Sequence, residues 1–314
     1  MTNELAIEVR DLRRSYGATE AVRGVSFEVR RGEVFCLLGP NGAGKTTTVE
    51  ILEGYRHRSG GEATVLGLDP ASGSRELREQ VGIVLQECGV QQDLSVYELL
   101  EMYGRYYSRR RPVGEVLELV ELTAKRDERA RKLSGGQRRR LDLALALIGD
   151  PGLIFLDEPT TGFDPAARRK AWSTLQSLRG LGKTIFLTTH YMDEAQHLAD
   201  RVAIMAGGEI IATGRPDELG GRDVRPAEIR FSLPEPWSLS DLPDLPELSR
   251  ELVDERALVV TRDPVRAVHL LTGWALDNDI EFGRLSVAQP TLEDIYLELT
   301  GEVGTQAVAQ EVRA

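Results

Sequence analysis

Apolar and polar positions follow two patterns over the first 221 residues, and each pattern predicts its own kind of strand. Apolar side chains alternate with polar ones in LAIEV (5–9) and VSFEV (25–29), which predicts half-buried strands at an antiparallel edge. Continuously apolar segments instead predict buried strands of a parallel sheet. Three such segments occur: VFCLLG (34–39), LIFLD (153–157) and TIFLTT (184–189). Because helical patterns separate them, we expect an α/β domain over residues 1–221.

Helix signals concentrate between about residues 87 and 150 and predict a helical subdomain. Ser95 and Glu98 form a capping box before VYELLEMYGRYY. Ser134 is well placed to cap a second helix, and Gly149 is a suitable C-terminal stop. Beyond this stretch, a helix start and a hairpin turn are predicted at Asp164-Pro165 and at Gly207-Gly208.

Residues 222–314 differ from the rest of the chain in pattern and in charge. Five prolines crowd its start, at positions 226, 234, 236, 243 and 246, which indicates loops and strand ends. Strands near 257–262 and 282–288, a helix over 265–276 and a helix from Thr291 then predict a small α+β domain. The segment holds 18 acidic and 9 basic side chains and so carries −9 of the net charge of −11. This acidity argues against nucleic acid as a general partner.

The chain shows no sign of crossing a membrane by itself. Its N-terminus lacks a basic region followed by an apolar block, and no apolar run reaches the roughly 18 residues of a spanning helix. We therefore expect a cytosolic protein that reaches a membrane only through a partner. Cys36 and Cys88 lie far apart in apolar surroundings, which favours buried thiols over a metal site.

A phosphate-binding loop follows the first buried strand. The sequence fits GxxxxGK[ST] and runs directly into a helical pattern, TTTVEILEG, a context that argues against a fortuitous glycine-rich turn. Backbone N–H groups of such a loop point at phosphate oxygens, and the helix N-terminus adds its positive dipole end. The lysine can reach the β- and γ-phosphates of ATP, and the first threonine can bind Mg²⁺. The loop consists of Gly39, Pro40, Asn41, Gly42, Ala43, Gly44, Lys45, Thr46 and Thr47.

Polar residues end the next two buried strands at what should be the same sheet edge. Asp157 ends LIFLD and is expected to bind Mg²⁺ through water. Glu158 follows it and can accept a proton from the attacking water, although a solvated acid at a strand end is the plainer alternative. His190 ends TIFLTTH, where a contact with the γ-phosphate competes with a purely structural role.

The string Leu133-Ser134-Gly135-Gly136-Gln137 resembles the LSGGQ signature of ABC ATPases. Other family elements match in order: Tyr16 the aromatic that stacks on adenine, Gln86 the glutamine loop, Asp164 the D-loop and His190 the switch histidine. The resemblance covers residues 4–220. It implies a P-loop NTPase core of the ABC ATPase type with an antiparallel β edge and a helical subdomain, plus the small α+β C-terminal domain.

The resemblance also implies a mechanism and its partners. In the family two copies meet head to tail, and Ser134, Gly135, Gly136 and Gln137 of one copy close over ATP bound by the other. Asp164 and Gln86 contribute to the same site, Gln86 through catalysis and the metal. A second copy and an integral membrane permease are the partners, and the chain is expected as a peripheral protein on the cytoplasmic side of the cell membrane.

Within the family the chain looks most like ATPase subunits of ABC-2-type exporters, including the daunorubicin-resistance and multidrug-efflux type. GPNGAGKTTTVEILEG, TTHYMDEAQHLADRVAIMAGGEIIATG and the tail TLEDIYLELTG carry this similarity. An importer ATPase and a soluble, non-transport ABC ATPase remain alternatives. The basic runs 109–111 and 138–140 are interpreted as solvated faces, with contact to a membrane subunit or lipid head groups as the alternative for the first run. In the tail, one helix face is interpreted as either a tail-to-tail contact or part of the tail's own core, through Leu292, Ile295, Tyr296 and Leu299.

Overall fold

The computed structural model describes residues 4–84, 89–253 and 255–311. The chain divides into two compact units, Met1–Pro216 and Asp217–Ala314. The boundary predicted at residue 221 falls inside a 3₁₀ segment, η4 (Leu219–Val224), of the second unit. No helix in the described ranges combines the length and the apolar character that a membrane span requires.

A six-stranded sheet forms the centre of the first unit. Its order is β5-β6-β7-β3-β8-β9, and all neighbours are parallel except the last pair. The three continuously apolar segments are its central strands, and every residue in them is buried, as predicted. The hairpin predicted at Gly207-Gly208 joins the last two strands. The strands are β3 (Val34–Leu38), β5 (Val81–Val84), β6 (Leu153–Asp157), β7 (Thr184–Thr189), β8 (Arg201–Ala206) and β9 (Glu209–Gly214).

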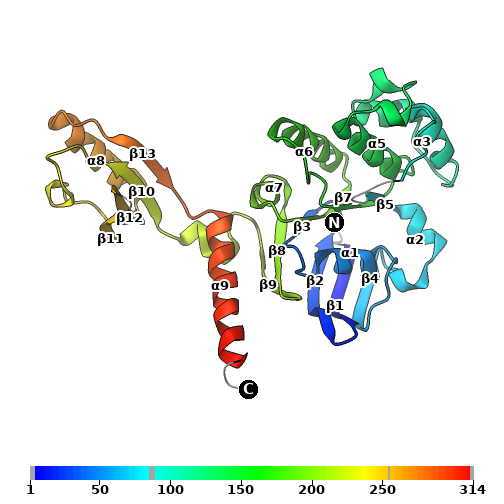
Figure 1. Cartoon of the computed structure of the whole chain (residues 1–314), viewed down its shortest axis with the longest axis horizontal. Helices are drawn as coiled ribbons and strands as arrows, with labels where there is room; N and C mark the ends of the chain where they lie inside the picture. Colours follow the sequence, from blue (N-terminus) through cyan, green and yellow to red (C-terminus); the bar gives the residue numbers. More distant parts are fainter. Residues whose placement is uncertain (1–3, 85–88, 254, 312–314) are drawn as a thin grey trace. The chain divides into compact units, whose positions relative to one another are not determined.

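The predicted antiparallel edge is a separate three-stranded sheet. β1 (Leu5–Tyr16) pairs with β2 (Thr19–Arg30) and with β4 (Gly60–Val65), a strand that the pattern did not predict. Helix α1 (Lys45–Leu52) contacts both sheets, so that a single apolar core fills the space between them. Phe27 stacks on Phe35 at the centre of that core. Figure 1 shows α1 and this sheet on one face of the six-stranded sheet.

Helices α6 (Pro165–Gly180) and α7 (Met192–Leu198) cover the other face (Figure 1). Asp164 is the N-cap of α6, as predicted, because its carboxylate accepts the backbone N–H groups of Ala166 and Ala167. The helix therefore starts directly after the loop that follows β6.

The predicted helical subdomain contains α3 (Val96–Gly104), α4 (Val113–Leu119) and α5 (Gly135–Leu147), which pack on one another. The predicted capping box of Ser95 with Glu98 is present, and the predicted cap Ser134 also forms a capping box, with Gln137. The helix predicted to reach Gly149 ends two residues earlier. Ahead of this group lies α2 (Arg75–Gln80).

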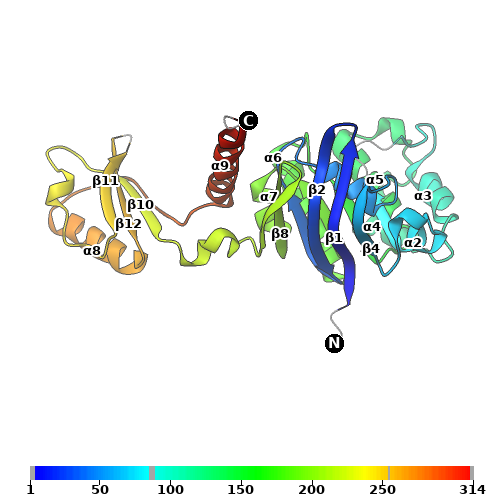
Figure 2. The same cartoon turned by 90° about the horizontal axis from the view of Figure 1, so that it is seen from below.

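The second unit is the expected α+β fold. Four antiparallel strands in the order β11-β12-β10-β13 carry α8 (Pro264–Asp277) on one face (Figure 2). The core between them contains Ile229, Phe231, Val259 and Leu271. The strands are β10 (Ala227–Ser232), β11 (Ser249–Val253), β12 (Arg256–Thr261) and β13 (Gly283–Ala288).

The last helix, α9 (Leu292–Glu311), resolves the two interpretations of its apolar face. Leu292 and Ile295 are fully buried, and α9 contacts η4, where Ile295 lies against Gly220. Tyr296 and Leu299 are half-buried. The first turns of α9 therefore pack on η4 within the second unit, and these two buried side chains are not available for a tail-to-tail contact.

Candidate functional site

The loop between β3 and α1 has the backbone that phosphate binding requires. Gly42 and Gly44 have φ angles of 82° and 103°, in the left-handed region that favours glycine. A Cβ atom at Gly39 would lie 2.2 Å from the carbonyl oxygen of Met205, and one at Gly44 would lie 2.5 Å from that of Ala21. The loop therefore curls tightly against β2 and β8, and side chains at these positions would block it.

Lys45 lies at the base of this loop with its side chain only 4% exposed. Its Nζ donates to the carbonyl oxygens of Gly39, at 2.8 Å, and Pro40, at 3.1 Å. The same atom lies 3.4 Å from Oε1 of Glu158. A cavity of about 480 Å³ opens beside it, and its wall includes Asn41, Gly42, Gly44, Thr46 and Thr47 of the loop. The charge of Lys45 thus faces a space large enough for a phosphate chain.

The end of β6 places two carboxylate residues beside this loop, and Thr188 of β7 contacts the side chain of the first and the backbone of the second. Asp157 accepts a hydrogen bond of 2.5 Å from the Thr188 hydroxyl. The N–H of Glu158 lies 3.0 Å from that hydroxyl and 3.2 Å from the Thr188 carbonyl oxygen. Glu158 itself has a φ of 46°, which turns its side chain out of the strand direction. Sequence reasoning did not single out Thr188, because nothing local marks it.

Glu158 lies beside Lys45 and His190, the other residues predicted to act on the phosphates. His190 Nδ1 lies 3.3 Å from its Oε2, and the hydroxyl of Thr161 donates to the same oxygen at 3.1 Å. Burial acts to raise the pKa of Glu158, but the charge of Lys45 and the contacts with Thr161 and His190 outweigh it and lower the pKa. The carboxylate is therefore ionised at neutral pH and can accept a proton.

Tyr16 lies at the end of β1 with 40% of its surface exposed. The guanidinium carbons of Arg14 and Arg56 lie 4.7 Å and 5.3 Å from its ring centre, and Arg56 is in turn paired with Glu50. An exposed aromatic ring beside cations can stack on a nucleotide base. The stacking of Tyr16 on adenine stays a prediction.

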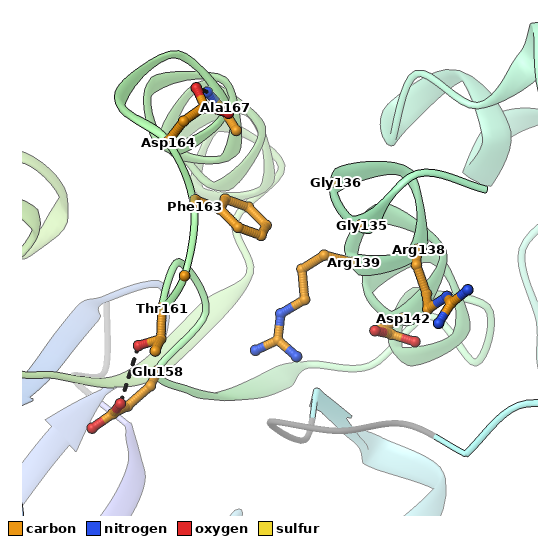
Figure 3. A pocket seen from close by; sticks show the side chains of 11 residues that line it. Gly135, Gly136, Arg138, Arg139, Asp142, Glu158, Thr161, Phe163, Asp164 and Ala167 are labelled. Atoms are coloured by element: carbon orange, nitrogen blue, oxygen red, sulfur yellow. Dashed lines mark hydrogen bonds between the residues drawn. The ribbon is translucent and has the colours of Figure 1, made fainter.

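The two glycines of the LSGGQ string line a different cavity of the same copy. Ser134 and Gln137 bond reciprocally as the cap of α5, and Ser134 and Gly135 are exposed. Together with Asp164, the two glycines line a cavity of about 550 Å³ (Figure 3). Glu158 lies at the border of this cavity and of the phosphate-loop cavity. The structure thus brings the phosphate loop, Glu158 and His190 together, and the LSGGQ residues line a neighbouring surface. Gln86 and Cys88 lie outside the described residues, whereas Cys36 is a buried free thiol.

Arg139 requires a correction to the interpretation of the run 138–140 as a solvated face. Its Nε donates to the carbonyl oxygen of Pro159 and its Nη2 to that of Asp157, each at 3.2 Å. Arg140 beside it lies 3.3 Å from Glu121 at the surface. A local pattern of three arginines cannot distinguish these positions, because the contacts of Arg139 are made only once α5 packs beside β6.

A phosphate loop between a buried strand and a helix, with an acidic pair at the end of a neighbouring strand, defines a P-loop nucleoside triphosphatase. Comparison with known proteins refines this class. The family "ABC transporter" matches residues 22–161, and the family "ABC transporter domain-containing protein-like, C-terminal domain" matches residues 227–291. The chain belongs to the ATP-binding subunits of ABC transporters, and its activity is ATP hydrolysis coupled to transport.

Individual relatives support this assignment over nearly the whole chain. The Nod factor export ATP-binding protein I of Rhizobium meliloti (strain 1021) is 40% identical over 302 residues, covering 95% of this chain and 88% of that protein. That of Ralstonia nicotianae is 39% identical and covers 94% of each. Among solved structures, cbiO1 from Clostridium perfringens, part of the ABC transporter complex cbiONQ, matches with a TM-score of 0.62 and 30% identity. The match covers 68% of this chain and 90% of that one.

Proposed function

We propose that this ATPase powers the export of a drug or lipid-like substrate through a separate integral membrane permease, from the cytoplasmic side of the membrane. The observation that carries the ATPase part is the meeting of Lys45, Glu158 and His190 beside the phosphate loop. Export is favoured because relatives named for export align with both units of the chain. An importer or a non-transport ATPase would share the cluster of Lys45, Glu158 and His190 but would not be expected to align over both units with relatives named for export.

ATP binding follows from the phosphate loop and Lys45. The backbone N–H groups of the loop and the start of α1 receive the phosphate chain, and Lys45 exchanges its loop carbonyl partners for phosphate oxygens. Tyr16 stacks on the adenine.

Mg²⁺ fits the oxygen donors at this edge. Thr46 presents an exposed hydroxyl in the cavity, and Asp157 offers a carboxylate anchored by Thr188, both hard oxygen ligands. No group of three or more His, Cys, Asp or Glu residues that could hold a metal occurs in the described ranges, which suits an ion that takes its other ligands from water and phosphates. Bound there, the ion neutralises charge on the phosphates. Gln86 is proposed as a further ligand.

Hydrolysis then depends on Glu158 and on a second copy. Glu158 accepts the proton of the attacking water, and His190 contacts the γ-phosphate and orients this carboxylate. Ser134 and Gly135 are exposed at the start of α5, so they are free to close over ATP held by another copy. Asp164 lines the same surface, and a head-to-tail homodimer would complete two sites.

The permease is proposed to dock on a groove beside the helical subdomain. A cavity of about 360 Å³ lies there, and its lining includes Glu53 and the three tyrosines Tyr55, Tyr103 and Tyr107. Tyr55 is 66% exposed, and aromatic side chains with a polar tip are favoured at protein interfaces.

The test is reconstitution of the chain with the membrane protein encoded beside it. Liposomes with the ATPase on the outside should accumulate substrate inside when ATP is added, and candidate compounds should stimulate ATP hydrolysis. Lys45→Ala is the control and should abolish both. Loss of preloaded substrate from the liposomes would instead indicate an importer, and ATPase activity without any co-purifying membrane protein would favour a non-transport role.

A further inference from the structure

The side chain of Arg139 connects two parts of the ATPase that are far apart in sequence. It leaves α5 five residues after Ser134 and ends at the loop that follows β6. Figure 3 shows it extending from α5 toward the segment that carries Glu158 and Thr161. Two hydrogen bonds of its guanidinium group go to backbone carbonyl oxygens at the end of β6 and in that loop.

Those two carbonyl groups flank Glu158 in sequence. Arg139 binds the carbonyl of Asp157 on one side and that of Pro159 on the other. Between them Glu158 holds a left-handed backbone, which a non-glycine residue keeps only where its surroundings fix it. On the β7 side, Thr188 fixes its N–H group. The guanidinium, with several donors in one rigid plane, is suited to fixing the other side.

We propose that Arg139 is a positioning residue that holds the proton-accepting carboxylate of Glu158 in its own copy. Arg139 stands on the helix whose first residues would serve the nucleotide of the other copy. Arg139 therefore links the start of α5, which would contact the ATP of the other copy, to Glu158, which acts on the ATP of its own copy. This proposal rests on the head-to-tail arrangement of the proposed function.

Kinetics of the full-length chain give the first test. Arg139→Gln should lower kcat by about tenfold or more, because small displacements of a reacting group are costly, and should leave ATP affinity within about twofold. Arg139→Lys should recover part of the rate. Arg140→Gln is the matched control on the same helix and should stay near wild type. Unchanged kcat in Arg139→Gln, an equal loss in Arg140→Gln, or loss of ATP binding would overturn the proposal.

Mixing two impaired variants shows which site Arg139 serves. A mixed dimer of Ser134→Arg and Arg139→Gln keeps one intact site only if Arg139 acts on the Glu158 of its own copy. Random pairing should then restore about a quarter of wild-type activity, since half of the dimers are mixed and each has one of two sites. A mixture of Glu158→Gln and Arg139→Gln should show no such recovery above the residual activity of the separate variants. If the mixture with Glu158→Gln recovered activity and the mixture with Ser134→Arg did not, Arg139 would act on the signature end of α5. That result would refute the proposal.

A third mixture separates this proposal from the one on which it rests. Lys45→Ala and Ser134→Arg should complement each other in any head-to-tail dimer, whatever Arg139 does. If they fail to complement, the head-to-tail arrangement is wrong and the link between opposite sites falls with it. The kcat of Arg139→Gln alone then still decides whether Arg139 positions Glu158.

Discussion

Single residues of the site are held by neighbours that also control their charge. Lys45 and Glu158 are the clearest pair, because the ammonium group lies 3.4 Å from the carboxylate and helps to keep its pKa low. Phosphate would compete for the same ammonium group. The state of Glu158 is therefore linked to whether nucleotide is bound.

Lys45→Ala removes the cation that faces the phosphate chain. We expect ATP affinity to fall roughly tenfold to a hundredfold, as a charge-assisted hydrogen bond contributes about 1.5–3 kcal/mol. Titration with a fluorescent ATP analogue measures this, and circular dichroism checks that the fold persists. Unchanged affinity would mean that the loop does not bind the phosphates.

Glu53 gives a prediction about stability. Burial, with smaller contributions from the charges of Asp157 and Glu50, raises the pKa of Glu53 from 4.5 to about 8, and its Oε1 has no hydrogen-bond partner in the described part of the chain. A raised carboxyl pKa in the folded state means that this contribution to stability falls as the pH rises from 4.5 to about 8.

Glu53→Gln removes that titration. Its free energy of unfolding relative to wild type should therefore increase between pH 5.5 and pH 8, as measured by urea unfolding at both pH values. A constant difference between the two proteins would show that Glu53 is already ionised in the fold.

The sequence was informative about the site where a motif coincides with a strand end. The phosphate loop, Asp157, Glu158 and His190 all follow strands that their apolar character already marks, so parallel pairing alone predicts their common edge. Arg139 and Thr188 could not be found in this way. Arg139 binds backbone carbonyl groups, and Thr188 binds a backbone N–H group and the carboxylate of Asp157, and the local sequence marks none of these contacts.

At the scale of elements, α5 serves two purposes with one N-terminus. Ser134 and Gln137 cap the helix, and the same exposed end is proposed to close over the other copy's ATP. The cap leaves the helix start ordered before any partner arrives. Ordering in advance lowers the entropy cost of dimer closure.

Ser134→Arg should prevent closure by bulk and charge while leaving ATP binding to the separate subunit within about twofold. Loss of the cap also costs about 1 kcal/mol of stability. Ser95→Arg is a matched control, because it removes the equivalent capping box of α3 without touching the signature. ATP titration and ATPase assays compare the two. Loss of ATP binding in Ser134→Arg alone would contradict the head-to-tail site.

Elements with a long apolar pattern were predicted from the sequence, and short elements were not. The central strands of the parallel sheet and the helix caps Ser95 and Ser134 were predicted, whereas β4 and β5 were not. β4 begins with two glycines, and β5 has four residues, so neither shows a periodicity of its own. Both become strands because a neighbour supplies the hydrogen bonds, β1 for β4 and β6 for β5.

At the scale of the whole molecule, the chain adds an acidic second unit to an ATPase core. The solved structure of cbiO1 matches 68% of this chain and is itself covered to 90%. The second unit carries its own sheet and core. We propose that it stabilises or regulates the assembly.

A chain ending at Pro216 tests that role, because the division between the units lies there and η4 is left out with the rest of the second unit. It should bind and hydrolyse ATP at rates close to the full chain but should assemble poorly with the permease, or lose transport. Co-purification and transport in cells measure both. Full transport by the shortened chain would leave its acidic unit a role in solubility only.

The head-to-tail ATP dimer is the central claim, and Glu158→Gln tests it most directly. The amide keeps the shape of the carboxylate but cannot accept the proton, so ATP should bind and stay unhydrolysed. Size-exclusion chromatography with light scattering should then show a dimer that forms only with Mg²⁺ and ATP, and Lys45→Ala in the same background should stay monomeric. Near-normal turnover by Glu158→Gln, or a monomer saturated with intact ATP, would contradict the account.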